Sequence, residues 1–200
     1  MQRFPTAALG ITSFVAGCSL LTSLDGLGPD DGGGDAVSDG SDNLLTNPSF
    51  EVGMGGCGTG WGNGYGMTFT RVSPGRTGSY ACLVCALPNE TDSYELDSLI
   101  PVPAEAGSYY AEAWLTTPEG GVATVAGIQG EYAGDGGISS CTGTNTICQG
   151  TFFTPPVGTW SVSSATFTVS ASGTLSVNVH SYGAPTGSCF EVDDLALYAQ

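Results

Sequence analysis

Apolar and polar residues alternate along much of the chain after residue 42, with the two-residue period of half-buried β-strands. In the clearest run, 109–116, every second residue from Tyr109 to Leu115 is apolar or aromatic and would face one side of a sheet. No segment repeats apolar residues at helical spacing over three turns. The predicted strands are 67–72, 80–85, 93–102, 109–116, 122–128, 160–169, 175–181 and 189–198. The pattern therefore predicts an all-β domain of about eight to ten strands, folded as a two-sheet jelly-roll β-sandwich.

The alternation is interrupted at two places. It slips within 93–102, which indicates a β-bulge. It slips again at Asp193-Asp194, because Phe190 and Val192 lie on one face and the apolar residues after Asp194 lie on the other. The pleat of the last strand must therefore shift at this acidic pair.

Three segments outside the clear strands need separate interpretation. Residues 43–53 predict a short strand, a tight bend and the start of a second strand. Residues 54–66 predict a Gly-rich loop around Trp61, for which a place in the core and a role as a sugar-stacking platform both stay open. Residues 134–150 predict a long loop.

The first 42 residues differ from the rest. A short basic start and an apolar run too short to span a bilayer end in Val15-Ala16-Gly17-Cys18, which resembles the lipobox of bacterial lipoproteins. This resemblance implies a signal peptide over 1–17, lipidation of Cys18, and an exported protein anchored to the cell envelope, at the outer membrane or the cell surface. Residues 18–42 are rich in Asp and Gly and predict a flexible tether to a single domain over 43–200. A plain secretory signal with a chance cysteine is the alternative.

The charge balance excludes two classes of partner. The formal net charge is −16, and Lys and Arg together number three. Nucleic-acid binding requires a basic surface, and so does a polybasic contact with anionic lipid. We therefore expect no nucleic-acid partner, contact with the membrane only through the lipid anchor, and a monomer.

The chain has seven cysteines, an odd number that needs explaining in an exported protein. Lipidation of Cys18 leaves six that can pair in an oxidising compartment: Cys57, Cys82, Cys85, Cys141, Cys148 and Cys189. The short separation of Cys141 and Cys148 predicts a local disulfide. Cys82 and Cys85 would point to opposite faces of a strand and so bond different partners, which leaves open whether each pairs with Cys57 or Cys189.

Several motifs occur in an order that resembles the carbohydrate-binding modules of the family 4, 9, 16 and 22 group. The likeness covers most of 43–198 and rests on Asn43-Leu44-Leu45, Asn47-Pro48, Phe50-Glu51, Gly60-Trp61, Gly75-Arg76-Thr77-Gly78-Ser79-Tyr80-Ala81, Tyr109, Ala113-Trp114, Gly158-Thr159-Trp160, Phe167-Thr168-Val169 and Val192-Asp193-Asp194-Leu195. The resemblance implies a galactose-binding-like jelly roll. It implies sugar binding less strongly, because one fold supports many functions.

The resemblance also implies a structural Ca²⁺ ion that ties the opening segment to the last strand. Glu51 and Asp193 would supply carboxylates, and Ser49 and Ser79 would add further oxygen ligands, a set that suits Ca²⁺ and not Zn²⁺. The alternative is that Glu51 and Asp193 are hydrogen-bonded turn residues without a metal.

A candidate sugar-binding face combines aromatic and polar side chains from two predicted strands. If 109–116 and 175–181 share a sheet, they bring together Tyr110, Glu112, Trp114, Asn178 and His180. Aromatic faces stack on sugar rings while amides and carboxylates bind hydroxyl groups. Tyr65, Tyr132 and Tyr182 stay open as loop contacts. The alternative is that the five residues are solvent-facing or part of the core.

The sequence gives little support for catalysis. His180 is the one histidine and lies in no nucleophile motif, and no pair of carboxylates stands out as a glycosidase dyad. We therefore expect a non-catalytic domain that binds a polysaccharide or glycan. The alternative is a structural or adhesion β-sandwich of the cell envelope that does not recognise sugar.

Overall fold

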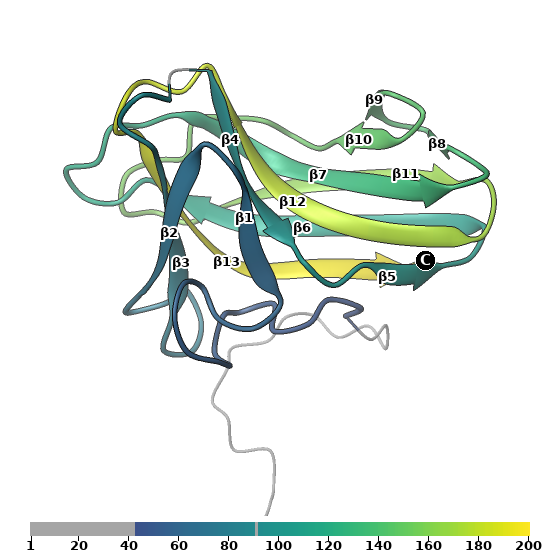
Figure 1. Ribbon diagram of the computed structural model, residues 1–200, viewed down its shortest axis with the longest axis horizontal. Coiled ribbons are helices and arrows are strands. Elements are labelled where there is room, and N and C mark those ends of the chain that lie inside the picture. The colour runs from purple at the N-terminus through teal and green to yellow at the C-terminus, as the bar shows by residue number, and fades with distance from the viewer. Residues whose placement is uncertain (1–42, 91) are drawn as a thin grey trace, which may run out of the picture. The chain divides into compact units, whose positions relative to one another are not determined.

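The computed structural model describes residues 43–90 and 92–200, which form thirteen β-strands in two antiparallel sheets (Figure 1). Sheet A has the order β1 (Trp61–Tyr65), β4 (Ser93–Ser98), β12 (Gly173–Tyr182), β7 (Val125–Gly134), β10 (Ile147–Gln149) and β9 (Thr142–Gly143), and β5 (Val102–Ala104) also pairs with β12. Sheet B has the order β2 (Met67–Val72), β3 (Ala81–Ala86), β13 (Cys189–Ala199), β6 (Gly107–Thr116), β11 (Ser161–Val169) and β8 (Ile138–Ser139). The predicted all-β two-sheet sandwich is confirmed.

The core lies between the two sheets and is filled by alternate residues of each strand. Tyr94 of sheet A stacks on Phe190 of sheet B with ring centroids 5.6 Å apart. Gly130 allows Phe167 of the other sheet to approach, because a Cβ atom at Gly130 would lie 2.9 Å from that ring. Both phenylalanines are fully buried, so the alternation read from the sequence is the alternation between core and outer face.

The opening segment differs from the prediction. Residues 43–60 contain no strand and run beside β13 as a series of bends and turns. The Leu44 N–H donates to the Leu197 carbonyl at 2.9 Å, and the Leu195 N–H donates to the Pro48 carbonyl at 3.0 Å. Phe50 has a positive φ of 59°, which breaks an extended conformation. The start and end of the domain are therefore neighbours, but not as two regular strands.

Three strand assignments are also corrected. The segment predicted as a Gly-rich loop contains the strand β1. Glycine has no side chain, so a strand rich in glycine shows no alternation of apolar and polar residues. Val102–Ala104 is the separate strand β5 and not the end of β4. The loop 134–150 contains the short strands β8, β9 and β10.

The pleat shift at Asp193-Asp194 is confirmed by the irregular register of β13 against β6 and by a φ of 47° at Asp194.

Three disulfides join Cys57 to Cys82, Cys85 to Cys189, and Cys141 to Cys148. The local Cys141–Cys148 pair is confirmed. The two cysteines of β3, Cys82 and Cys85, bond different partners, as their opposite directions required. Cys18 and the whole of 1–42 lie outside the described residues.

Trp61 belongs to the core. It is 3% exposed, its ring centroid lies 5.4 Å from that of Phe50, and its Nε1–H donates to the Asn47 carbonyl at 2.8 Å. A sugar-stacking role for Trp61 is therefore excluded by burial.

In the described part of the chain, no helix is long and apolar enough to cross a bilayer.

Candidate functional site

The outer face of sheet A carries a band of polar and aromatic side chains, here called the polar strip. Leu175, Val177 and Val179 of β12 point into the core, so the residues between them point outward. Register places Asn178 opposite Asp97 of β4 and His180 opposite Glu95. The strip consists of Tyr65, Glu95, Asp97, Gln129, Glu131, Asn178, His180, Tyr182 and the overlying Phe152.

Hydrogen bonds hold the centre of the strip in place. The His180 Nδ1 atom lies 2.9 Å from a Glu95 carboxylate oxygen. The Asn178 side-chain amide donates to Glu131 at 3.1 Å and approaches Glu95 at 3.5 Å. Since β4, β12 and β7 are adjacent, these bonds cross three strands and fix the side chains before any ligand arrives.

Three polar atoms at the centre of the strip have no hydrogen-bond partner. They are Asp97 Oδ1, Asn178 Oδ1 and His180 Nε2. Asn178 is 3% exposed and His180 is 6% exposed, so these groups are largely shielded from water. A buried polar atom without a partner costs about 1–3 kcal/mol, and such atoms in a native protein call for an explanation. A bound ligand would supply the missing partners.

The strip is rich in negative charge. The pKa of Asp97 is raised to about 6, first by burial and then by the neighbouring charges of Glu95 and Glu131, against the opposing effect of His180. Burial and the charge of Glu95 also raise the pKa of Glu131, against the opposing effects of Asn178 and His180. Burial is the largest cause of both raised pKa values, and repulsion between the neighbouring carboxylates adds to it.

Aromatic rings flank the polar centre. The Tyr182 ring centroid lies 4.1 Å from that of His180 and 5.1 Å from that of Phe152, and the Tyr65 ring lies 6.3 Å from His180. Gly127 leaves room for Phe152 over the sheet, because a Cβ atom there would lie 2.9 Å from its ring. The result is a set of apolar faces beside hydrogen-bonding groups, an arrangement that suits a sugar chain.

Two amides orient the ring of Tyr182. The side-chain amide of Gln129 donates to the Tyr182 hydroxyl at 2.6 Å, and that of Gln149 donates to it at 2.8 Å. Tyr65 and Tyr182 are both exposed and available to a ligand, whereas Tyr132 is buried and donates its hydroxyl to the carbonyl of Ala171 at 3.0 Å. Two of the three tyrosines left open by the sequence therefore belong to the strip.

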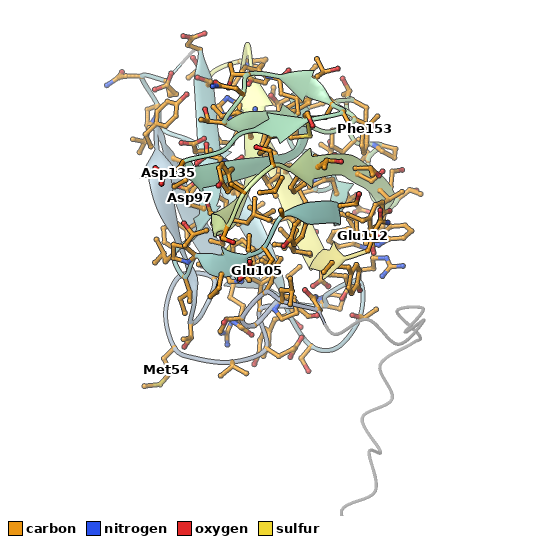
Figure 2. All side chains as sticks on the ribbon, turned by 90° about the vertical axis from the view of Figure 1, so that its right-hand side faces the viewer. Met54, Asp97, Glu105, Glu112, Asp135 and Phe153 are labelled. Atoms are coloured by element: carbon orange, nitrogen blue, oxygen red, sulfur yellow. A yellow bond between two sulfur atoms is a disulfide. The ribbon has the colours of Figure 1, made fainter. Side chains whose placement is uncertain are left out.

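The predicted five-residue sugar face is divided between the two sheets. Asn178 and His180 lie in the polar strip, but Tyr110, Glu112 and Trp114 project from β6 on the outer face of sheet B. The condition that both strands share a sheet is not met, and Figure 2 shows Asp97 and Glu112 on opposite sides of the domain. Alternation in β6 and β12 gave the correct outward residues, but it contains no information on which strands pair.

The three residues of sheet B are bound to one another or to their neighbours. The Tyr110 hydroxyl donates to Glu112 at 2.9 Å, and the Tyr110 ring stacks on Tyr198. The Arg76 guanidinium lies 3.6 Å from the centroid of the Trp114 ring, in a cation–π contact. The Trp114 indole face is therefore covered by the protein itself.

Sequence reasoning missed three acidic residues of the strip. Glu95 and Asp97 alternate with the buried Tyr94 and Leu96 in β4, so the pattern already placed them on the outer face. Glu131 occupies the equivalent outward position in β7. The available signal was alternation, but only the pairing of β4, β12 and β7 shows that these carboxylates meet.

The predicted calcium ligands surround the turn at Asp193-Asp194. Asp193 is fully buried, and its Oδ2 accepts hydrogen bonds from the backbone N–H groups of Arg76 and Thr77 at 2.7 and 3.2 Å. Its Oδ1 accepts from the Asp194 N–H at 2.8 Å. The Arg76 guanidinium forms an ion pair with Asp194 at 2.5 Å.

Glu51 and Ser49 contact the same region. One carboxylate oxygen of Glu51 accepts from the backbone N–H groups of Ser79 and Tyr80, both at 2.8 Å. The Ser49 hydroxyl donates to Asp194 at 3.1 Å. The opening segment and the last strand thus both hold the loop 76–80, which brings together the segments that the sequence predicted.

This arrangement does not fit a calcium ion. Calcium requires oxygen lone pairs, whereas Asp193 and one oxygen of Glu51 already accept bonds from N–H groups, whose positive ends would repel a cation. The positive charge beside Asp194 comes from Arg76. Within 43–90 and 92–200, no three His, Cys, Asp or Glu side chains gather as a metal-binding set. We therefore assign no ion to these residues.

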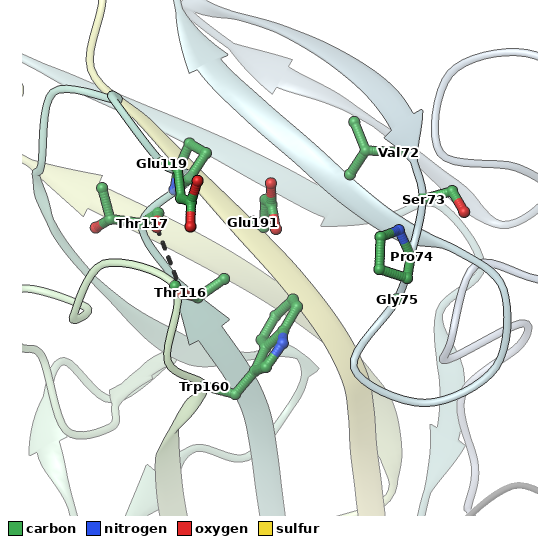
Figure 3. A pocket seen from close by; sticks show the side chains of 11 residues that line it. Val72, Ser73, Pro74, Gly75, Thr116, Thr117, Glu119, Trp160 and Glu191 are labelled. Carbon is green, nitrogen blue, oxygen red and sulfur yellow. Dashed lines mark hydrogen bonds between the residues drawn. The ribbon is translucent and has the colours of Figure 1, made fainter.

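A hollow lies against sheet B, at the ends of β2 and β6 (Figure 3). It has a volume of about 370 Å³ and is lined by Trp160, Glu119, Glu191 and the Ser73-Pro74 turn, among others. Burial raises the pKa of Glu191. Its polar groups include none of the unpartnered buried atoms found in the polar strip.

Comparison with protein-family models finds no match, and comparison with curated proteins finds none either. Solved structures do match. The CBM22-1 xylan-binding domain of Paenibacillus barcinonensis Xyn10C is 13% identical, with a TM-score of 0.59 over 80% of this chain and 95% of that one. TmCBM61, solved with β-1,4-galactotriose, is 19% identical, with a TM-score of 0.52 over 80% of this chain and 100% of that one. The C-terminal family 22 module of Clostridium thermocellum Xyn10B is 15% identical, with a TM-score of 0.53 over 76% and 90%.

The fold resembles that of the family 22 carbohydrate-binding modules. At these identities the likeness concerns the fold and not the ligand. Several of the matched domains are carbohydrate-binding modules, and some belong to multidomain enzymes such as the Xyn10B xylanase.

Proposed function

We propose that this protein binds a glycan, without catalysis, on the polar strip of sheet A. The observation that carries the proposal is the row of unpartnered atoms on Asp97, Asn178 and His180, held between aromatic rings. Sugar hydroxyls would satisfy these atoms, and Tyr65 and Tyr182 would stack on the sugar rings. Matched modules solved with galactotriose and with xylohexaose support the reading by analogy of fold.

Replacement of strip residues is expected to weaken glycan binding. Asn178→Ala removes a polar contact, and Tyr65→Ala removes an exposed ring, so each should weaken binding by about tenfold or more. Tyr110→Ala, on the opposite sheet, is the matched aromatic control and should bind normally. A glycan array identifies the ligand, and titration calorimetry with that ligand measures the affinities.

The result also separates this proposal from its alternative. A structural or adhesion domain without sugar recognition would bind no glycan on the array. Loss of binding in Tyr110→Ala, with normal binding in Asn178→Ala, would move the site to sheet B and refute the assignment to the strip.

We propose further that a lipid on Cys18 anchors the domain to the bacterial cell envelope. The support is the Val15-Ala16-Gly17-Cys18 motif and the odd number of cysteines. In a bacterial host, the protein is expected to partition into detergent and to incorporate labelled fatty acid, and Cys18→Ser should remove both properties. Equal labelling of the Cys18→Ser variant would disprove the anchor.

A further inference from the structure

We propose that the polar strip selects a glycan that carries a free amino group, such as a polymer of 2-amino-2-deoxyglucose, over neutral and acidic glycans. This inference rests on the proposed function, because it specifies the ligand of the same site. It comes from the kind of atom that is left unpartnered and from the charge around it.

Two of the three unpartnered atoms of the strip are acceptors, and the third, His180 Nε2, is an acceptor when the imidazole is neutral and Nδ1 carries the proton. Asp97 Oδ1 and Asn178 Oδ1 are oxygens with lone pairs. In the tautomer in which His180 donates from Nδ1 to Glu95, its Nε2 also presents a lone pair. The ligand must therefore bring hydrogen-bond donors. An ammonium group has three donors and no acceptor, whereas a hydroxyl brings one donor.

The negative charge around these atoms also favours a ligand that brings donors and positive charge. Glu95 and Glu131 each contact the amide of Asn178, and Asp97 lies opposite Asn178 in the register. Within the described residues, His180 is the one basic group that touches this cluster. Arg71 binds the Val52 carbonyl and Arg76 binds Asp194, so neither balances the carboxylates.

An ammonium group over the Asp97–Asn178 pair would supply both the donors and the missing positive charge. Charge-assisted hydrogen bonds to carboxylates are about twice as strong as neutral ones. A glycan that carries uronate or sulfate would instead place a negative charge among three carboxylates and be rejected. The rings of Tyr65 and Tyr182 would contact the apolar faces of the sugar in either case.

The test compares short oligosaccharides of glucosamine with their N-acetylated counterparts, which have the same ring and linkage but no charge. With the amine protonated, calorimetry is expected to show about tenfold tighter binding of the free amine. Asp97→Asn and, separately, Glu131→Gln should each remove this preference. Glu112→Gln, which deletes one charge on the opposite sheet, should keep it. Circular dichroism confirms that each variant is folded.

Two outcomes overturn the inference while the proposed function stands. One is equal or tighter binding of the N-acetylated or another neutral glycan. The other is an equal loss in Glu112→Gln and Asp97→Asn, which would indicate diffuse attraction to an acidic protein. Failure of every glycan to bind would refute the proposed function together with this inference.

Discussion

Asp193→Ala is expected to lower the free energy of unfolding by about 3–5 kcal/mol, because it leaves buried N–H groups without an acceptor. The carboxylate of Asp193 accepts from the backbone of Arg76, Thr77 and Asp194, and so holds the loop 76–80 against the last strand. Urea denaturation followed by tryptophan fluorescence measures the loss. Glu105→Ala, at an exposed position between β5 and β6, is a control expected to change stability by less than about 1 kcal/mol.

The effect of Asp193 should also depend on pH. Burial, together with the charge of Asp194, raises the pKa of Asp193 from 3.8 to about 7, against three backbone hydrogen bonds that lower it. The folded state therefore binds the proton more tightly than the unfolded state, and this contribution to stability is lost as the pH rises from about 4 to 7. The stability difference between the wild-type protein and Asp193→Ala should shrink over this range. A difference that grows with pH would contradict the raised pKa.

A metal chelator decides between the hydrogen-bonded turn and a calcium site. Since N–H donors already engage Asp193 and one oxygen of Glu51, and Arg76 pairs with Asp194, a chelator is expected to leave the melting temperature unchanged. A lower melting temperature with chelator, absent in Asp193→Ala, would show that a cation organises this region. The calcium ligand set expected from the sequence would then be restored.

The second large effect is expected from the disulfide between Cys85 and Cys189. These residues are 104 positions apart, so the bond constrains most of the domain in the unfolded state. Replacing both by Ala should cost about 4–5 kcal/mol in the chain-entropy description. The matched control is the double Ala variant of Cys141 and Cys148, whose separation of 7 predicts a cost of about 2–3 kcal/mol. Equal costs for the two variants would show that loop length does not govern the contribution.

The sequence alone determined the class of fold and the direction of most side chains. Alternation is a local property with a period of two, so it placed Asn178 and His180 outward without knowledge of their neighbours. The same local reasoning located the pleat shift at Asp194 and the opposed directions of Cys82 and Cys85. Glycines and turn residues gave weaker signals, which is why β1 was missed and residues 43–53 were assigned strands that do not form.

Only the tertiary structure decided which outward residues meet. Strand pairing depends on long-range contacts that no local pattern records, so it separated Trp114 from His180 and joined Glu95, Asp97 and Glu131 into one strip. The same holds at the chain ends, where two of the three backbone N–H groups that donate to Asp193 come from a loop more than one hundred residues earlier in the chain. A carboxylate in a sequence can bind a metal, a sugar or an N–H group, and the donors that folding brings to it determine which.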